Sequence, residues 1–197
     1  DEQHRFGVRQ RASLSEKSNH PHTLVMSATP IPRTLALMIY GDLDVSSIDE
    51  LPPNRQPVKT YVISSKIKER AYNFLKDHLD RGLQGYIVCP LVEAMETTPA
   101  NLQNAEEYAD KLARGSFQNY RVGVLHGKMR AKDREAIMQQ FASGEIQLLV
   151  STTVIEVGVD VPNAVIMMVE NAERFGLSQL HQLRGRVGRG SVQSYWM

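Results

Sequence analysis

The stretch "RVGVLHGKMRAKDREAIMQQFASGEIQLLVS", residues 121–151, decides the fold because it contains one complete strand–helix–strand unit. Residues 121–126 and 146–151 are short apolar runs that predict buried strands, and residues 131–143 predict a helix that ends at Gly144. Strands that are apolar along their whole length and alternate with helices are typical of a parallel sheet with helices on both faces.

The same alternation continues on either side of this unit. Further strands are predicted at residues 59–63, 86–91 and 164–169, further helices at 66–81, 105–114 and 177–188, and a strand begins near 194–197. The predicted fold class is therefore α/β, with a doubly wound parallel sheet.

The first 58 residues have a different pattern. Residues 22–27 predict one strand and 33–40 one short helix, which cannot form a core by themselves. Residues 51–58 contain three prolines and predict a stiff, extended linker. We expect residues 1–50 to be the C-terminal part of one domain, and 59–197 to be a second domain truncated at its end. The chain is expected to be a fragment of a longer protein.

The overall composition excludes several classes of protein. Apolar residues make up 42% of the 197 residues, charged residues 23%, and the formal net charge is +1. These values are typical of a globular protein, and any contact with nucleic acid must come from local patches. Cys89 is the sole cysteine, which excludes an internal disulfide and fits a reducing cytosol. The apolar runs are far shorter than the ~20 residues of a membrane span, so no membrane association is expected.

Polar groups follow the predicted strands. His126 and Lys128 come after one strand, and Thr152 and Thr153 after the next. Ligands of such sheets bind beyond the carboxyl ends of the strands, and hydroxyl groups there are common phosphate contacts. Residues 182–189, "QLRGRVGR", interleave three arginines with glycines. Arginine suits phosphate oxygens, and glycine permits close backbone approach.

Each feature also has a simpler explanation. Asp1-Glu2 could be a solvated terminus, His126 a buried histidine bonded to the backbone, and Thr152-Thr153 ordinary strand ends. The arginine cluster could be a nucleic-acid-binding tail. Their order along one chain, however, makes chance agreement very unlikely.

That order resembles the motor core of superfamily 2 helicases, in which two RecA-like domains clamp ATP. Asp1-Glu2-Gln3-His4 resembles the Walker B motif, and Ser27-Ala28-Thr29 the coupling motif. Residues 152–160 and 182–189 resemble the last two motifs of the second domain. Residues 1–11, 27–34, 49–53 and 179–186 resemble, more narrowly, the RecG family of bacterial branched-DNA helicases.

The resemblance implies roles for individual residues. Asp1 would hold Mg²⁺ through water, Glu2 would orient or deprotonate the attacking water, and His4 would couple this site to Ser27 and Thr29. Arg186 and Arg189 would reach the γ-phosphate from the second domain. The implied nucleotide-binding and coupling set also includes Gly158, Asp160 and Gln182. The implied DNA contacts are His126, Lys128, Thr152 and Thr153.

The implied cofactors are ATP and Mg²⁺, and the implied partner is branched double-stranded DNA. Single-stranded-DNA-binding protein is a further expected partner, for a monomer in the bacterial cytoplasm near the nucleoid. No Gly-x-x-x-x-Gly-Lys-Ser/Thr loop occurs, so this chain alone should not hydrolyse ATP. Two alternatives stay open: the transcription-repair coupling factor family, and a nucleic-acid-binding module without catalysis.

Overall fold

The computed structural model describes residues 55–90, 100–152 and 160–197, together with positions 22, 24, 26, 44, 46, 48 and 50. For residues 100–106 it describes the backbone alone. The chain divides into two compact units, Asp1–Asp49 and Glu50–Met197. The strand and helix expected before residue 50 lie outside the described residues, apart from isolated positions. The assignment of residues 1–50 to a first RecA-like domain therefore stays a prediction.

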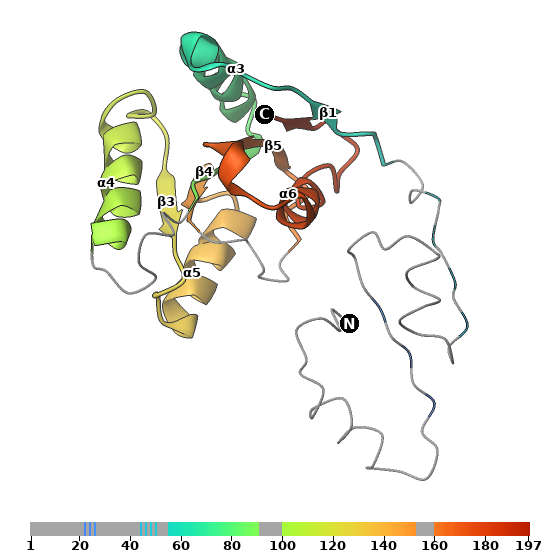
Figure 1. Cartoon of the computed structure of the whole chain (residues 1–197). Helices are drawn as coiled ribbons and strands as arrows, with labels where there is room; N and C mark the ends of the chain where they lie inside the picture. The colour runs from blue at the N-terminus through green and yellow to red at the C-terminus, as the bar shows by residue number, and fades with distance from the viewer. Residues whose placement is uncertain are drawn as a thin grey trace. The chain divides into compact units, whose positions relative to one another are not determined.

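The described residues form one sheet of six strands, all parallel, in the order β1-β6-β5-β2-β4-β3 (Figure 1). The strands are β1 (Lys59–Thr60), β2 (Gln84–Val88), β3 (Val122–Leu125), β4 (Leu148–Ser151), β5 (Ala164–Val169) and β6 (Tyr195–Trp196). The central strands are buried along their whole length, as β2 and β4 show. This arrangement confirms the predicted α/β class and parallel sheet.

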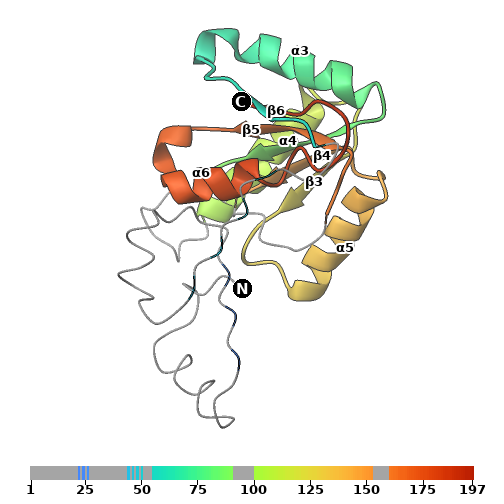
Figure 2. The same ribbon diagram turned by 90° about the vertical axis from the view of Figure 1, so that its right-hand side faces the viewer.

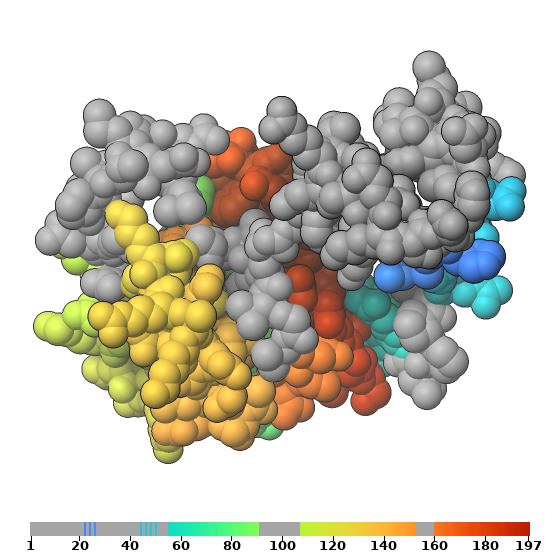
Figure 3. All heavy atoms as spheres, turned by 90° about the horizontal axis from the view of Figure 1, so that it is seen from below, coloured from blue at the N-terminus to red at the C-terminus, as the bar shows by residue number. Residues whose placement is uncertain are grey.

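Helices cover both faces of this sheet (Figure 2). They are η2 (Ser65–Ile67), α3 (Lys68–Leu79), α4 (Ala100–Arg114), α5 (Ala131–Ala142), η3 (Ala172–Arg174) and α6 (Leu177–Arg184). Leu75 of α3 and Leu112 of α4 join the core on one face, and Phe141 of α5 and Leu183 of α6 join the core on the other. In the space-filling view, the light-orange surface of α5 and the red surface of the C-terminal residues are visible on the same side of the molecule (Figure 3).

Some predicted boundaries are wrong, for local physical reasons. The helix expected over 177–188 ends at Arg184, and Gly188 adopts a φ of +76° that no α-helix contains. Strand β2 begins at Gln84 because its buried amide donates to the carbonyls of Phe141 at 2.5 Å and Ile146 at 2.7 Å. None of the helices within the described ranges has the length and apolar character required to cross a bilayer.

Candidate functional site

The arginine-rich segment forms a turn after α6, which we call the arginine turn (residues 184–191). Its backbone leaves the helix through bonds from Gly185 N to His181 O at 3.1 Å and from Arg186 N to Leu183 O at 2.9 Å. Val187 is fully buried in the core, between the two arginines proposed to reach ATP. A buried anchor in the middle of the turn fixes Arg186 and Arg189 on either side of it.

Arg189 is held in place by two hydrogen bonds. Its Nε donates to the carbonyl of Gly185 at 3.1 Å, and its Nη1 lies 3.3 Å from Oδ1 of Asp160. The two side chains are 31% and 57% exposed, so the ion pair itself contributes only about 0–1 kcal/mol to stability. The bonds orient the guanidinium more than they stabilise the fold.

Arg186, Arg189 and Asp160 also act on a common neighbour, Tyr86 of β2. Burial raises the pKa of the Tyr86 hydroxyl, while the charges of Arg189 and Arg186 lower it and the charge of Asp160 raises it. Tyr86 belongs to the core on the α5–α6 face of the sheet. The structure therefore brings three of the predicted nucleotide-site residues together on this face. Gln182, also predicted, lies half-buried in the last turn of α6.

The predicted DNA-contact residues lie at the carboxyl ends of two neighbouring strands. Leu125, the last residue of β3, pairs with Ser151 of β4, and Thr152 N donates to Leu125 O at 3.1 Å. Lys128 is exposed and His126 is half-buried. Thr152 is only 5% exposed, so its hydroxyl must become accessible before it can touch a phosphate. Their role in DNA binding stays a prediction.

Seven predicted site residues lie outside the described residues. They are Asp1, Glu2, His4, Ser27, Thr29, Thr153 and Gly158. Asp1 is the residue predicted to hold Mg²⁺. Across residues 55–90, 100–152 and 160–197, no group of three His, Cys, Asp or Glu side chains has the arrangement of a metal site.

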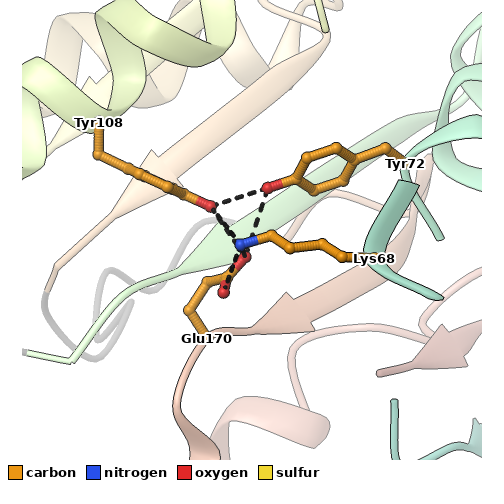
Figure 4. Close-up of polar contacts among 4 residues, drawn as sticks. All are labelled: Lys68, Tyr72, Tyr108 and Glu170. Carbon is orange, nitrogen blue, oxygen red and sulfur yellow. Dashed lines mark hydrogen bonds and ion pairs between the residues drawn. The ribbon is translucent and has the colours of Figure 1, made fainter. Parts of the chain in front are cut away.

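A second polar group, which the sequence patterns did not predict, lies at the carboxyl end of β5 (Figure 4). We call it the carboxyl-edge cluster: Lys68 and Tyr72 of α3, Tyr108 of α4, and Glu170, which follows β5. Glu170 lies 2.8 Å from the Lys68 ammonium and accepts from the Tyr108 hydroxyl at 2.8 Å. The hydroxyls of Tyr72 and Tyr108 are 2.9 Å apart. Since Tyr108 donates its proton to Glu170, Tyr72 donates to Tyr108.

Burial and the Glu170 charge shift the ionisation of this cluster. Burial raises the pKa of Tyr108, and the bond to Tyr72 and the charge of Glu170 raise it further. Burial alone would lower the pKa of Lys68, but its hydrogen bond and attraction to Glu170 raise it above the ordinary value. Burial, reinforced by Glu170, raises the pKa of the nearby Cys89 thiol to about 12. The tyrosines and the thiol are therefore neutral at physiological pH.

Comparison with known proteins identifies the relatives of this chain. Residues 65–191 match the sequence model of the helicase conserved C-terminal domain family. The ATP-dependent DNA helicase RecG of Synechocystis sp. is 55% identical over 195 residues, which cover 99% of this chain and 23% of that protein. RecG of Thermotoga maritima is 50% identical, with coverage of 99% and 25%. The chain thus spans about a quarter of the length of these relatives.

A solved structure gives the same result at the level of the fold. The structure of RecG bound to a three-way DNA junction matches 87% of this chain and 22% of its own, with a TM-score of 0.71 and 46% identity. The predicted resemblance to RecG and the RecA-like fold are confirmed. The transcription-repair coupling factor receives no support from these relatives.

Proposed function

Because the chain belongs to the helicase conserved C-terminal domain family, we propose that it is the second motor domain, with part of the first, of an ATP-dependent helicase that remodels branched DNA. The observation that carries this proposal is the arginine turn. Residues 182–191 contain three arginines and no acidic residue, so the turn is a concentrated site of positive charge. Its backbone is fixed by Val187, and one guanidinium is oriented by Asp160.

This geometry suits the stabilisation of phosphoryl transfer. Charge builds on the γ-phosphoryl oxygens of ATP as the bond breaks, and a guanidinium that is already positioned stabilises it without reorganisation. Arg186 and Arg189 would supply this charge from the second domain. Hydrolysis would then depend on closure of the two domains, which links chemistry to movement along DNA.

The remaining parts of the reaction are assigned to residues before position 50. Asp1 would hold Mg²⁺ through water, Glu2 would orient the attacking water, and Ser27 and Thr29 would couple the nucleotide to DNA. When bound, Mg²⁺ would neutralise phosphate charge. The phosphate-binding loop would lie outside this sequence, so we expect no DNA-stimulated ATP hydrolysis by these 197 residues alone.

The DNA substrate is proposed from the relatives and from the strand ends. RecG, at 46% identity, has been solved with a three-way junction. Lys128, exposed just after β3, would contact the phosphate backbone independently of sequence. We further propose that the whole protein is a monomer in the bacterial cytoplasm that associates with the nucleoid, and that it meets single-stranded-DNA-binding protein there.

The test uses the full-length helicase with Arg189→Ala and measures kcat for ATP hydrolysis at saturating branched DNA. We expect a loss of about 10³–10⁵-fold with DNA affinity retained. Lys should rescue poorly, since its point charge cannot reproduce the planar fork. Arg114→Ala is the matched control, because its ion pair with Asp110 is exposed on α4. A near-normal kcat for Arg189→Ala would defeat the arginine assignment and favour simple DNA binding by the turn.

A second measurement tests the DNA surface. Lys128→Ala in the full-length protein should weaken DNA binding equally for all sequences. It should also reduce the slope of log affinity against log salt by about 0.9, the value for one lost phosphate contact. An unchanged affinity and slope would remove Lys128 from the DNA surface.

A further inference from the structure

The segment before β1 is bonded directly to the arginine turn and the loop that follows it. Arg55 Nε donates to the carbonyl of Gly188 at 2.9 Å, and Gln56 Nε2 donates to the carbonyl of Ser191 at 3.1 Å. In the opposite direction, Gln193 Nε2 donates to the carbonyl of Pro57 at 2.8 Å. The predicted linker over 51–58 is therefore, in its second half, attached to residues more than 130 positions away.

Packing at Gly188 makes this attachment close. Gly188 has a φ of +76°, and a Cβ at this position would lie 2.8 Å from Cγ2 of Val58 and 3.8 Å from the carbonyl oxygen of Gln56. Val58 itself packs against the core cluster that contains Val187. The backbone of the turn thus approaches residues 56–58 so closely that a side chain at position 188 would force Val58 or the turn to shift.

The hydrogen bond of Arg55 lies close in the chain to the two arginines proposed to act on ATP. Its acceptor, the carbonyl of Gly188, lies in the chain between Arg186 and Arg189, directly before Arg189. Arg55 is half-buried, and a charged donor to a backbone carbonyl is stronger than a neutral one. Removing this donor would free the carbonyl, and the turn could then rotate about the anchor at Val187.

We propose that Arg55 is a positioning residue for the arginine turn, which carries Arg186 and Arg189. This inference rests on the proposed function, because it assumes that these arginines act on ATP. Arg55 would touch neither ATP nor DNA. It would set where the two guanidinium groups stand when the domains close, and misplacement of a catalytic group by about 1 Å costs on the order of 10²-fold in rate.

If Arg55 only stabilised the fold, its removal would have a different result from the one that a positioning role predicts, so an experiment can separate the two explanations. If the bond only stabilised the fold, Arg55→Ala would lower the melting temperature and leave the kcat of the folded enzyme unchanged. If Arg55 positions the turn, kcat falls while the KM for ATP and the DNA affinity stay the same. Arg55 and Arg189 would also be coupled, since the first acts through the second.

The experiment uses the full-length helicase with Arg55→Ala, Arg189→Ala, the double variant and Arg114→Ala as control. Single-turnover ATP hydrolysis is measured at saturating branched DNA, with melting temperatures alongside. We expect about a 10–100-fold slower rate for Arg55→Ala. When it is added to Arg189→Ala, we expect a further loss smaller than the loss it causes alone, because only the part that acts through Arg186 remains, and no change for the control. Arg55→Lys, which keeps the charge without the planar donor, should lie between and serves if the Ala variant does not fold.

Each result supports or overturns one specific claim. A normal rate for Arg55→Ala or Arg55→Lys, with a slow Arg189→Ala, overturns the role of Arg55 and leaves the proposed function intact. A double variant whose losses multiply also overturns it, because Arg55 would then act independently of Arg189. A normal rate for Arg189→Ala defeats the proposed function itself, whatever Arg55 does.

Discussion

The arginine turn and the carboxyl-edge cluster are both polar groups on the same sheet, yet their charges are arranged in opposite ways. The cluster contains one cation, Lys68, and one anion, Glu170, joined at 2.8 Å, with two neutral tyrosines that donate along the same chain of oxygens. The hydrogen-bond donors and acceptors of the cluster are therefore bonded to one another. The arginine turn instead has three cations within six residues, and among the described residues Arg189 pairs with the carboxylate of Asp160.

This difference shows how a ligand site can be told from a structural network. Arginine has five N–H donors, and the bonds of Arg189 employ Nε and Nη1. The network with matched charges joins two helices to a strand end, whereas the positive charge of the turn supports the proposal that it binds an anion.

The largest expected effect on stability comes from a substitution that breaks the carboxyl-edge cluster. Glu170→Ala removes the acceptor shared by Lys68 and Tyr108, and should lower the free energy of unfolding by about 2–3 kcal/mol. Urea denaturation of this chain measures the change. Asp110→Ala, which removes an exposed ion pair with Arg114, is the control and should stay within about 0.5 kcal/mol. An equally small effect of both variants would show that the cluster does not hold α3 and α4 to the strand end.

A smaller effect is expected from Gly188→Ala in the arginine turn. The left-handed φ of +76° is strained for alanine, and the added methyl group would press on Val58 at 2.8 Å. We expect a loss of about 2 kcal/mol by the same denaturation. Gly144→Ala is the matched control, since Gly144 has a φ of +81° with open space around its Cβ position, and strain alone should cost about 1 kcal/mol. Equal losses would show that the contact with Val58 contributes nothing.

The smallest expected effect is a change in how the stability of the carboxyl-edge cluster depends on pH. Folding raises the pKa of Tyr108 and Tyr72 above 10, so their contribution to stability is complete below pH 10 and is lost as pH rises through the folded pKa values. Each such proton adds up to about 1.4 kcal/mol of destabilisation per pH unit. Thermal unfolding between pH 9 and pH 11 should show a shallower decline for Tyr108→Phe. An unchanged slope would indicate that Tyr108 ionises as easily in the folded state as in the unfolded one.

Much of the fold could be predicted because apolar periodicity is a local property. The strand over residues 164–169 was predicted with its observed bounds, since six consecutive apolar residues can only be buried. The start of β2 was misplaced because Gln84 is polar, and its suitability for burial depends on the carbonyls of Phe141 and Ile146, 57 and 62 residues away. Tertiary contacts of this kind leave no local pattern.

The candidate site also contains one part that local sequence reveals and one part that it does not. The arginine motif could be recognised because its residues are contiguous, although the sequence placed it within a helix over 177–188 and it forms a turn after Arg184. The cluster could not, because Lys68, Tyr108 and Glu170 belong to three elements, and each alone resembles an ordinary helix or loop residue. Tyr108 lies in the helix predicted over residues 105–114, and a helical pattern accounts for its ring without its hydroxyl.

The position of β6 in the sheet determines when the domain can be completed during synthesis. β1 is an edge strand that pairs with β6, so residues 59 and 60 can form their sheet hydrogen bonds only after residues 195 and 196 have been synthesised. Ribosomes add about 5–20 residues per second, so β1 remains without its partner for roughly 7 to 27 s after it has been made. During that interval β2 to β5 can pair with one another, while Tyr61 and Val62, both strongly exposed in the finished fold, stand next to an unpaired edge. This interval is when the nascent domain is most open to pairing with the wrong strand.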